Sequence, residues 1–192
     1  MARQGLTGIL LVGGASERFG SPKPLARFGG ETLAERAWRT LGEACEHRLA
    51  VGKAADALEL PFPVLDDGSE VQAPIVGLIA GLEAAQTELC VVLPVDCPRV
   101  TPAFLLELAE ACRDVARPRR GPLPGAYRRS ALPALRGGPL AIHRAIAGLD
   151  VAVLDVDAEL LVNVNTPEEL AALDERRGDP PDGGRSASEP GP

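Results

Sequence analysis

Ile-Leu-Leu-Val-Gly-Gly-Ala-Ser-Glu-Arg-Phe-Gly-Ser-Pro-Lys forms residues 9–23 and joins an apolar run to a glycine-rich loop. A buried strand would deliver the chain to a turn that exposes backbone N–H groups at Gly13 and Gly14. Arg18 and Lys23 follow within the same loop. Backbone donors beside two cations are typical of a polyphosphate site. The alternative is a tight strand-to-helix turn with solvated charges.

Composition favours a specific role for Lys23. The chain has 18 Arg but only 2 Lys, and Pro22 and Pro24 bracket Lys23. These prolines restrict the backbone and help to hold the side chain in place. No Gly-Lys-Ser/Thr follows the glycines, and their spacing is not G-x-G-x-x-G. The loop is therefore neither a Walker A motif nor a dinucleotide-binding fingerprint.

Bulk properties limit the class of protein. A chain of 192 residues with 45% hydrophobic content predicts one domain, over residues 1–176. Gly, Pro, Asp and Ser dominate residues 177–192, which we expect to be a disordered tail. A net charge of −7 argues against a nucleic-acid partner. No apolar stretch approaches the roughly 20 residues that span a bilayer, and an early first strand leaves no room for a signal peptide. We expect a cytoplasmic protein without a membrane partner.

The four cysteines are scattered and form no C-x-x-C pair. Cys90 and Cys112 lie in apolar contexts, which predicts reduced core thiols. Cys97 follows an acidic residue at a strand end, where partial exposure and a role as metal ligand or nucleophile are the alternative to a core position.

Apolar runs and helical periodicities alternate along the chain, which predicts a three-layer α/β sandwich with a mainly parallel sheet. Residues 117–124 are rich in Arg, Pro and Gly and are expected to form an exposed loop. Strands are predicted over 7–12, 48–51, 63–65, 89–95, 126–128, 151–156 and 161–162. Helices are predicted over 31–45, 74–85, 130–135 and 140–147, and from Thr101 and Thr166.

Polar residues follow several of these strands, at the edge where ligands bind in such sheets. Asp66-Asp67, Asp96 and the pair Asn163 and Asn165 are the candidates besides the glycine loop. Asp96 ends a buried strand and is a candidate Mg²⁺ ligand, or else only caps the following turn. The two asparagines alternate on a predicted strand end, so both would face one side. They would read the edge of a heterocycle or tie down the loop before Thr166.

Several segments together resemble the molybdenum cofactor guanylyltransferases, which are MobA-like nucleotidyltransferases. The loop from Leu11 to Lys23 is similar to the signature loop of nucleotidyltransferases that activate sugars and cofactors. Asn163-Val-Asn-Thr-Pro-Glu-Glu-Leu170 resembles the C-terminal motif of the guanylyltransferases. The similarity runs from about residue 6 to 174, with further matches at Pro94-Val-Asp-Cys-Pro98, Ala73-Pro-Ile-Val-Gly77 and Tyr127-Arg-Arg-Ser-Ala-Leu132.

This resemblance implies a Rossmann-like nucleotidyltransferase fold and a Mg²⁺-dependent transfer of GMP from GTP to the molybdopterin cofactor, with release of pyrophosphate. It implies that Asp96 binds Mg²⁺ as well as GTP, and that Asn163 and Asn165 lie near the pterin substrate. Molybdoenzymes or their chaperones are candidate partners. The catalytic charges would come from Arg18, Lys23 and Asp96, and GTP would be bound by Leu11, Val12, Gly13, Gly14, Lys23, Asp67 and Asp96.

Two positions depart from the family pattern. Family members often carry an Asn after the second strand, facing the guanine, where this chain has Ala50-Val-Gly-Lys53. A histidine often precedes the Pro-Leu segment, where this chain has Gly121. A related transferase that uses CTP, or one acting on a sugar or cobamide phosphate, is therefore an alternative. A non-catalytic nucleotide-binding adaptor is another.

Overall fold

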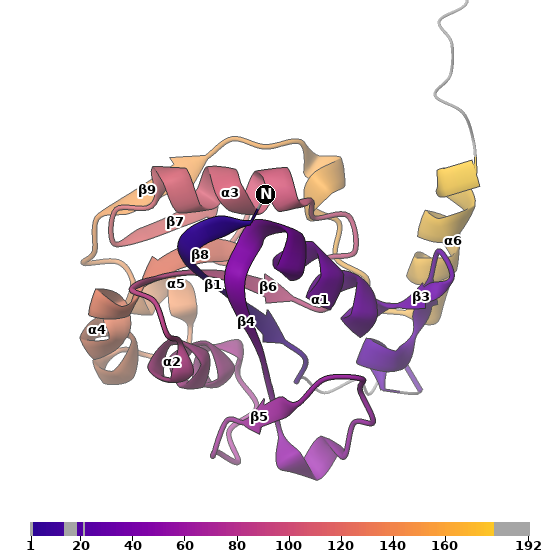
Figure 1. Ribbon diagram of the computed structural model, residues 1–192, viewed down its shortest axis with the longest axis horizontal. Coiled ribbons are helices and arrows are strands. Elements are labelled where there is room, and N and C mark those ends of the chain that lie inside the picture. Colours follow the sequence, from indigo (N-terminus) through magenta and orange to yellow (C-terminus); the bar gives the residue numbers. More distant parts are fainter. Residues whose placement is uncertain (1, 14–18, 21, 179–192) are drawn as a thin grey trace, which may run out of the picture.

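A seven-stranded sheet forms the centre of the computed structural model, which describes residues 2–13, 19–20 and 22–178 (Figure 1). Its strand order is β5-β4-β1-β6-β8-β7-β9. All neighbouring strands pair in parallel except at β8, which is antiparallel to β6 and to β7. The strands are β1 (Arg3–Leu11), β4 (Cys45–Gly52), β5 (Val64–Asp66), β6 (Leu89–Pro94), β7 (Val115–Pro118), β8 (Gly125–Arg128) and β9 (Val151–Leu154).

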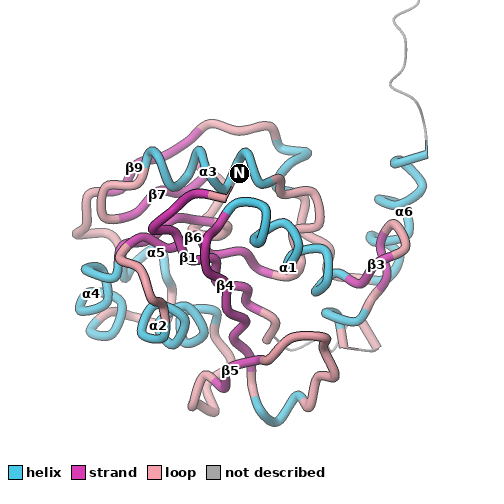
Figure 2. Tube along the Cα trace, in the orientation of Figure 1, coloured by secondary structure: helices cyan, strands magenta, loops and turns pink. Residues whose placement is uncertain are grey.

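Helices cover both faces of this sheet, as Figure 2 shows with the helices in cyan and the strands in magenta. One face carries α1 (Leu33–Ala44) and α3 (Pro102–Ala111). The other face carries α2 (Pro74–Ala84), α4 (Leu132–Gly137) and α5 (Ile142–Ala145). The predicted three-layer sandwich with a mainly parallel sheet is therefore confirmed.

Two further elements lie at one side of the sandwich. The small hairpin of β2 (Arg27–Phe28) and β3 (Glu31–Thr32) precedes α1, and α6 (Pro167–Gly178) lies beside it (Figure 1). Leu170 and Leu173 of α6 join the same core as α1 and α3. The predicted tail begins within the last turn of α6, and residues 179–192 lie outside the described residues, so the domain boundary at 176 stays a prediction.

The described residues form two hydrophobic cores, one on each face of the sheet, because the central strands are buried on both faces. In β1, Leu6 and Leu10 pack toward α1 and α3, while Ile9 and Leu11 pack toward α2. Such two-sided burial explains why the sequence of this strand is continuously apolar. Gly81 lets α2 lie close to the sheet, since a Cβ there would be 2.5 Å from Ile9 Cγ2.

The second half of the sheet differs most from the sequence predictions. Residues 117 and 118 belong to β7, although a loop was expected there. The strand predicted over 161–162 is wrong, because residues Ala158–Leu161 form a 3-10 helix, η4, and the following residues are irregular.

Helix α3 begins as predicted, with Thr101 as its N-cap accepting from Phe104 N at 3.3 Å. Within the described chain, no helix has both the length and the apolar character to cross a membrane.

Candidate active site

A cavity of about 670 Å³ opens at the carboxyl ends of the central strands. Strands β4 and β5 lie on one side of β1, and β6 lies on the other side, so the strand order changes direction here. Open α/β sheets bind ligands at such a switch point. Seven of the predicted site residues line the cavity, namely Leu11, Val12, Gly13, Lys23, Asp67, Asp96 and Asn163. The predictions for Gly14 and Arg18 lie outside the described residues.

The end of β1 forms the floor of this cavity. Val12 N donates a hydrogen bond to Val51 O at 2.9 Å, which extends the pairing of β1 with β4 into the loop. A Cβ on Gly13 would be 3.4 Å from Gly52 Cα, and a Cβ on Gly52 would be 2.8 Å from Val12 Cγ2. Gly52 therefore allows the loops after β1 and β4 to approach closely beside the cavity, whereas a side chain at Gly13 would make ordinary contact.

Lys23 and Asp96 form an ion pair at the cavity wall. Lys23 Nζ lies 3.7 Å from Asp96 Oδ2, and the two side chains are 16% and 25% exposed. Lys23 opens a 3-10 helix, η1 (Lys23–Leu25), with Pro22 as its N-cap and Pro24 as its second residue. The pair is long for an ion pair and partly open, so both charges remain accessible to a ligand in the cavity.

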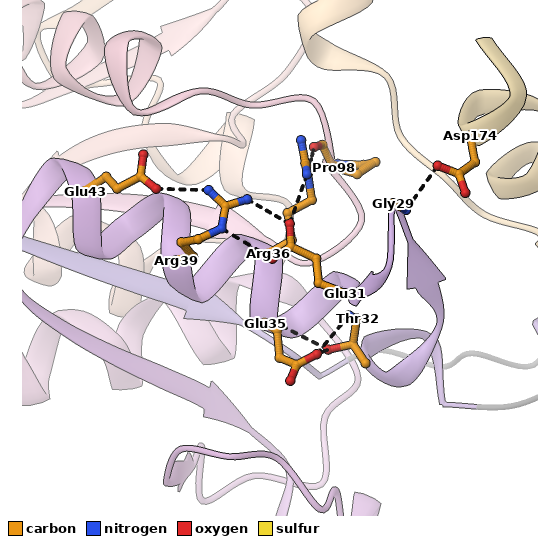
Figure 3. A network of polar contacts seen from close by, with 9 residues as sticks. All are labelled: Gly29, Glu31, Thr32, Glu35, Arg36, Arg39, Glu43, Pro98 and Asp174. Atoms are coloured by element: carbon orange, nitrogen blue, oxygen red, sulfur yellow. Dashed lines mark hydrogen bonds and ion pairs between the residues drawn. The ribbon is translucent and has the colours of Figure 1, made fainter. Parts of the chain in front are cut away.

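The segment after β6 that carries Asp96 is held from several sides. Val95 N donates to Leu11 O at 3.0 Å, and Val164 N donates to Asp96 O at 3.0 Å. From α1, Arg36 Nε donates to Pro98 O at 2.6 Å, as drawn in Figure 3. These bonds fix the Asp96 backbone to the first strand, to the C-terminal segment and to α1, so the carboxylate is presented by a rigid turn.

Figure 3 shows how the same network reaches α6. At the start of α1, Thr32 and Glu35 form a capping box. Glu31 pairs with Arg36 at 3.1 Å and with Arg39 at 2.7 Å. Before β3, Gly29 N donates to Asp174 Oδ1 of α6 at 3.0 Å. The hairpin and α6 are thus tied together beside the segment that delivers the two asparagines.

Asn163 and Asn165 reach the site from the far end of the chain, although not from a strand. Asn163 Oδ1 accepts a hydrogen bond from Cys97 Sγ at 2.8 Å, and Asn165 Oδ1 accepts one from Lys23 Nζ at 3.5 Å. The expectation that they alternate on a strand end is wrong, because the segment after η4 is irregular. Both side chains nevertheless contact the immediate surroundings of the Lys23–Asp96 pair. Asn163 lines the cavity.

Cys97 is buried rather than partly exposed, with 4% of its surface accessible. Burial, and next the charge of Asp96, raise the pKa of the Cys97 thiol well above its usual value. A thiol that keeps its proton donates to Asn163 and is a poor nucleophile or metal ligand. Cys90 and Cys112 are buried and free, as predicted for core thiols, and Cys45 is buried and free as well.

Lys53 and Asp67 make a second ion pair in the cavity, and sequence reasoning had given Lys53 no role. Lys53 Nζ donates to Asp67 Oδ1 and Oδ2 at 3.0 and 2.9 Å and to Ser69 O at 2.6 Å. The two side chains are only 9% and 7% exposed. Asp67 Oδ1 also accepts from Ser69 N at 3.0 Å. The rarity of lysine in this chain, already the argument for Lys23, would have identified Lys53 as well.

The opposite wall comes from the second half of the sheet and was also missed. It is formed by Arg120, Gly121, Pro122, Leu123, Leu140, Ala141 and Ile142. Tyr127 is fully buried, and its hydroxyl donates to Pro122 O at 2.5 Å. Burial raises the pKa of Tyr127, so the phenol keeps its proton and remains a donor at neutral pH. Leu140, which is 59% exposed, contributes an apolar side chain to this wall.

The donor set suits a metal shared with a substrate rather than a metal held by the protein alone. Among residues 2–13, 19–20 and 22–178, no group of three or more His, Cys, Asp or Glu side chains is placed to hold a metal ion. Mg²⁺ usually takes one or two carboxylates and completes its coordination with water and phosphate oxygens. The accessible carboxylate of Asp96 fits that pattern.

The chain has clear relatives. Residues 8–149 match the family described as MobA-like NTP transferase domain. A probable molybdenum cofactor guanylyltransferase from Chloroflexus aggregans is 33% identical over 190 residues, which cover 86% of this chain and 91% of that relative. A protein of the same name from Deinococcus radiodurans is 33% identical over 184 residues, covering 89% and 95%.

Solved structures agree with these matches. The crystal structure of molybdopterin-guanine dinucleotide biosynthesis protein A from Archaeoglobus fulgidus superimposes with a TM-score of 0.74 at 25% identity, covering 89% of this chain and 98% of that one. A Methanothermobacter nucleotidyl transferase has the same fold, with a TM-score of 0.74 at 18% identity and coverage of 91% and 98%. The predicted Rossmann-like nucleotidyltransferase fold is confirmed, and the chain is a nucleotidyltransferase that belongs to the MobA-like NTP transferase family.

Proposed function

We propose that this protein transfers GMP from GTP to the terminal phosphate of the molybdopterin cofactor and releases pyrophosphate, in a Mg²⁺-dependent reaction. One observation carries the proposal. A single cavity gathers Gly13 and Lys23 from the start of the chain, Asp96 from its middle and Asn163 from its end. Relatives that are 33% identical over most of the chain are named molybdenum cofactor guanylyltransferases, which supports this choice of substrates.

The reaction needs no side-chain nucleophile. An oxygen of the acceptor phosphate attacks the α-phosphorus of GTP and forms a new P–O bond. The bond between the α-phosphorus and the bridging oxygen breaks, and pyrophosphate leaves with that electron pair. The protein must bring two anions together in line and offset their charge. The buried, protonated Cys97 fits a reaction without a thiolate.

Lys23 and Asp96 are the residues we place at the reacting phosphates. The Lys23 ammonium would neutralise phosphate oxygens as charge moves toward the leaving pyrophosphate. The Asp96 carboxylate would hold Mg²⁺, whose chemistry, when bound, is to compensate charge on phosphate oxygens. The backbone at Leu11, Val12 and Gly13 would line the nucleotide. Gly14 and Arg18 remain proposed contacts from the same loop.

Asp67 is the residue we propose at the nucleotide side of the cavity. Its carboxylate accepts three hydrogen bonds from Lys53 and Ser69, which leaves acceptor capacity for a ligand. Guanine presents N1–H and N2–H donors, and the remaining acceptor position on Asp67 Oδ2 would accept one of them. Lys53 donates to both oxygens of Asp67, so its contribution would be to hold this carboxylate in place.

Asn163 and Asn165 are proposed to contact the pterin substrate, because both lie beside the Lys23–Asp96 pair. We further propose a cytoplasmic reaction, since GTP is available there, with molybdoenzymes or their chaperones receiving the product. A net charge of −7 speaks against a nucleic-acid acceptor.

Pyrophosphate release tests the proposal. The purified protein is given Mg²⁺ and GTP, CTP, UTP or ATP, each with and without molybdopterin. We expect pyrophosphate only with GTP, molybdopterin and Mg²⁺ together, and none after EDTA is added. Preferential turnover of CTP would establish the cytidylyl alternative. Nucleotide binding without any pyrophosphate release would establish a non-catalytic adaptor instead.

A further inference from the structure

Three arginines at and after the end of β7 have different surroundings. Arg117 Nη1 donates to Pro118 O at 3.0 Å and to Arg119 O at 3.4 Å. Arg119 pairs with both carboxylate oxygens of Asp155, at 2.7 and 2.9 Å. Arg120 is exposed and lines the cavity, and it makes no hydrogen bond or ion pair with any described residue. Arg117 and Arg119 therefore make contacts within the fold, whereas Arg120 lines the cavity.

Arg120 lies at the other side of the reacting centre from Asp67. Strand β7 runs in the same direction as β6, because β8 is antiparallel to both, so its carboxyl end reaches the same sheet edge. In the strand order, β4 and β5 with Lys53 and Asp67 lie beyond β1, while β8 and β7 lie beyond β6. Three strand spacings of about 4.8 Å separate β4 from β8. Asp96 lies between the two ends.

Of the cavity-lining residues that the structure describes, the two lysines are paired with carboxylates and Arg120 is not. Lys23 lies 3.7 Å from Asp96, and Lys53 lies 2.9 Å from Asp67. Among the described residues that line the cavity, Arg120 is the cation with no carboxylate beside it. This end of the cavity consequently carries an uncompensated positive charge, which favours an anionic ligand.

The segment that bears Arg120 is held in place before any ligand arrives. Arg119 N donates to Leu154 O at 3.0 Å, which adds to the bridge from Arg119 to Asp155. On the other side, Tyr127 fixes Pro122 O through its buried hydroxyl. An arginine on an anchored segment loses less conformational freedom when it binds an anion.

We propose that Arg120 binds the phosphate of the acceptor through its guanidinium fork. The guanidinium presents paired N–H donors that match two phosphate oxygens. The neighbouring wall at Pro122, Leu123 and Leu140 offers apolar side chains for the ring system of the same acceptor. The identity of the acceptor as molybdopterin rests on the proposed function, but the affinity of this end for phosphate does not.

The matched control is Arg144, an exposed residue of α5 that lies two positions after the cavity residue Ile142 and does not line the cavity. Its side chain makes no hydrogen bond or ion pair with any described residue, so Arg144→Gln removes the same charge nearby without disturbing such a contact. We expect Arg120→Gln to lower kcat/KM for molybdopterin about 10- to 100-fold, with the Kd for GTP unchanged. Arg120→Lys should recover part of the loss, and Arg144→Gln should match the wild type. Equal weakening of GTP and molybdopterin, or equal behaviour of the two Gln variants, would overturn the proposal.

A second measurement separates this proposal from the proposed function. The protein is saturated with Mg²⁺ and a GTP analogue that has a methylene group between its α- and β-phosphates, and inorganic phosphate is then titrated while Tm is followed. Phosphate should raise Tm for the wild type and Arg144→Gln and much less for Arg120→Gln. If the wild type releases no pyrophosphate with molybdopterin, the proposed function fails while this titration still decides on Arg120. Identical phosphate responses in all three proteins would contradict the assignment.

Discussion

The two halves of the sheet contribute to the cavity in different ways. The parallel half, β5-β4-β1-β6, supplies charges in pairs, Lys53 with Asp67 and Lys23 with Asp96. The half formed by β8, β7 and β9 supplies Arg120 and an apolar wall that includes the exposed Leu140. Among the described residues, the charges of the parallel half that line the cavity are therefore compensated, and the other half has an excess positive charge at Arg120.

This difference bears on how the two substrates would be held. The described residues of the parallel half add no net positive charge, so they alone do not neutralise a triphosphate. A divalent cation on Asp96 would supply the missing charge, which accounts for the Mg²⁺ dependence we propose. On the acceptor side, Arg120 would offset about one of the roughly two negative charges of a terminal phosphate. Substitutions in the two halves should accordingly affect different substrates.

The largest effect is expected for Asp96→Asn. Asn keeps the size of the side chain but removes the charge that would hold Mg²⁺, so turnover should fall by about a thousandfold, or roughly 4 kcal/mol. Pyrophosphate release is measured against Mg²⁺ concentration, with Asp150→Asn as a control at an exposed carboxylate far along the chain. Retained Mg²⁺-dependent turnover would remove Asp96 from the metal site.

Lys53→Met, in the parallel half, should chiefly lower the free energy of unfolding of the protein. The substitution leaves the Asp67 carboxylate, which is only 7% exposed, without its ion-pair partner. We expect a loss of about 3 kcal/mol in the free energy of unfolding, measured in urea. The double variant Lys53→Met/Asp67→Asn should recover more than half of this loss, because no buried charge is left unpaired. Additive losses in the double variant would mean that the pair is not coupled.

Lys23→Ala should reduce turnover by a hundredfold or more, on the order of 3 kcal/mol of transition-state stabilisation. The measurement is kcat for pyrophosphate release at saturating GTP and Mg²⁺. Arg27→Ala serves as the control, since this exposed cation lies just after η1 and bonds only to Gly30 O, at 2.9 Å. Near-wild-type turnover in the Lys23 variant would exclude this lysine from the chemical step.

Tyr127→Phe should have the smallest effect and should act on the acceptor half alone. Loss of the hydroxyl that donates to Pro122 O should cost about 1 kcal/mol of stability. It should also raise KM for molybdopterin while KM for GTP stays constant, because the Arg120 segment loses one of its anchors. An increase in KM for GTP of the same size would show that the two halves do not serve separate substrates.

Sequence reasoning predicted the parallel half of the fold well because burial leaves a strong pattern there. Strands buried on both faces read as continuous apolar runs, as in Leu89–Pro94, and the residues after them reach one sheet edge by topology. The positions of Gly13, Lys23, Asp67 and Asp96 beside one cavity follow from that rule. Their roles in binding GTP and Mg²⁺ stay predictions.

In the other half, β8 and β9 lie where strands were predicted, but β7 was missed because it depends on tertiary contacts. Strand β7 reads Val-Ala-Arg-Pro, and it forms a strand because β8 and β9 pair with it on both sides. Residues 161–162 are apolar yet follow a 3-10 helix, so apolar character alone misidentified them. Arg120 was not predicted because it lies in an arginine-rich segment. The sequence does not show that Arg117 and Arg119 have partners within the fold while Arg120 lines the cavity. Lys53 was missed because the sequence alone does not show that its side chain reaches Asp67, 14 positions further along the chain.

The fate of the α-phosphate tests the central claim most directly. The protein is incubated with Mg²⁺, molybdopterin and GTP labelled at the α-phosphorus, and the label is followed by chromatography of the cofactor fraction. We predict that the α-label appears in the cofactor in a one-to-one ratio with released pyrophosphate, and only when molybdopterin is present. Recovery of the label as free GMP, or pyrophosphate release that does not depend on molybdopterin, would contradict a site built for two substrates.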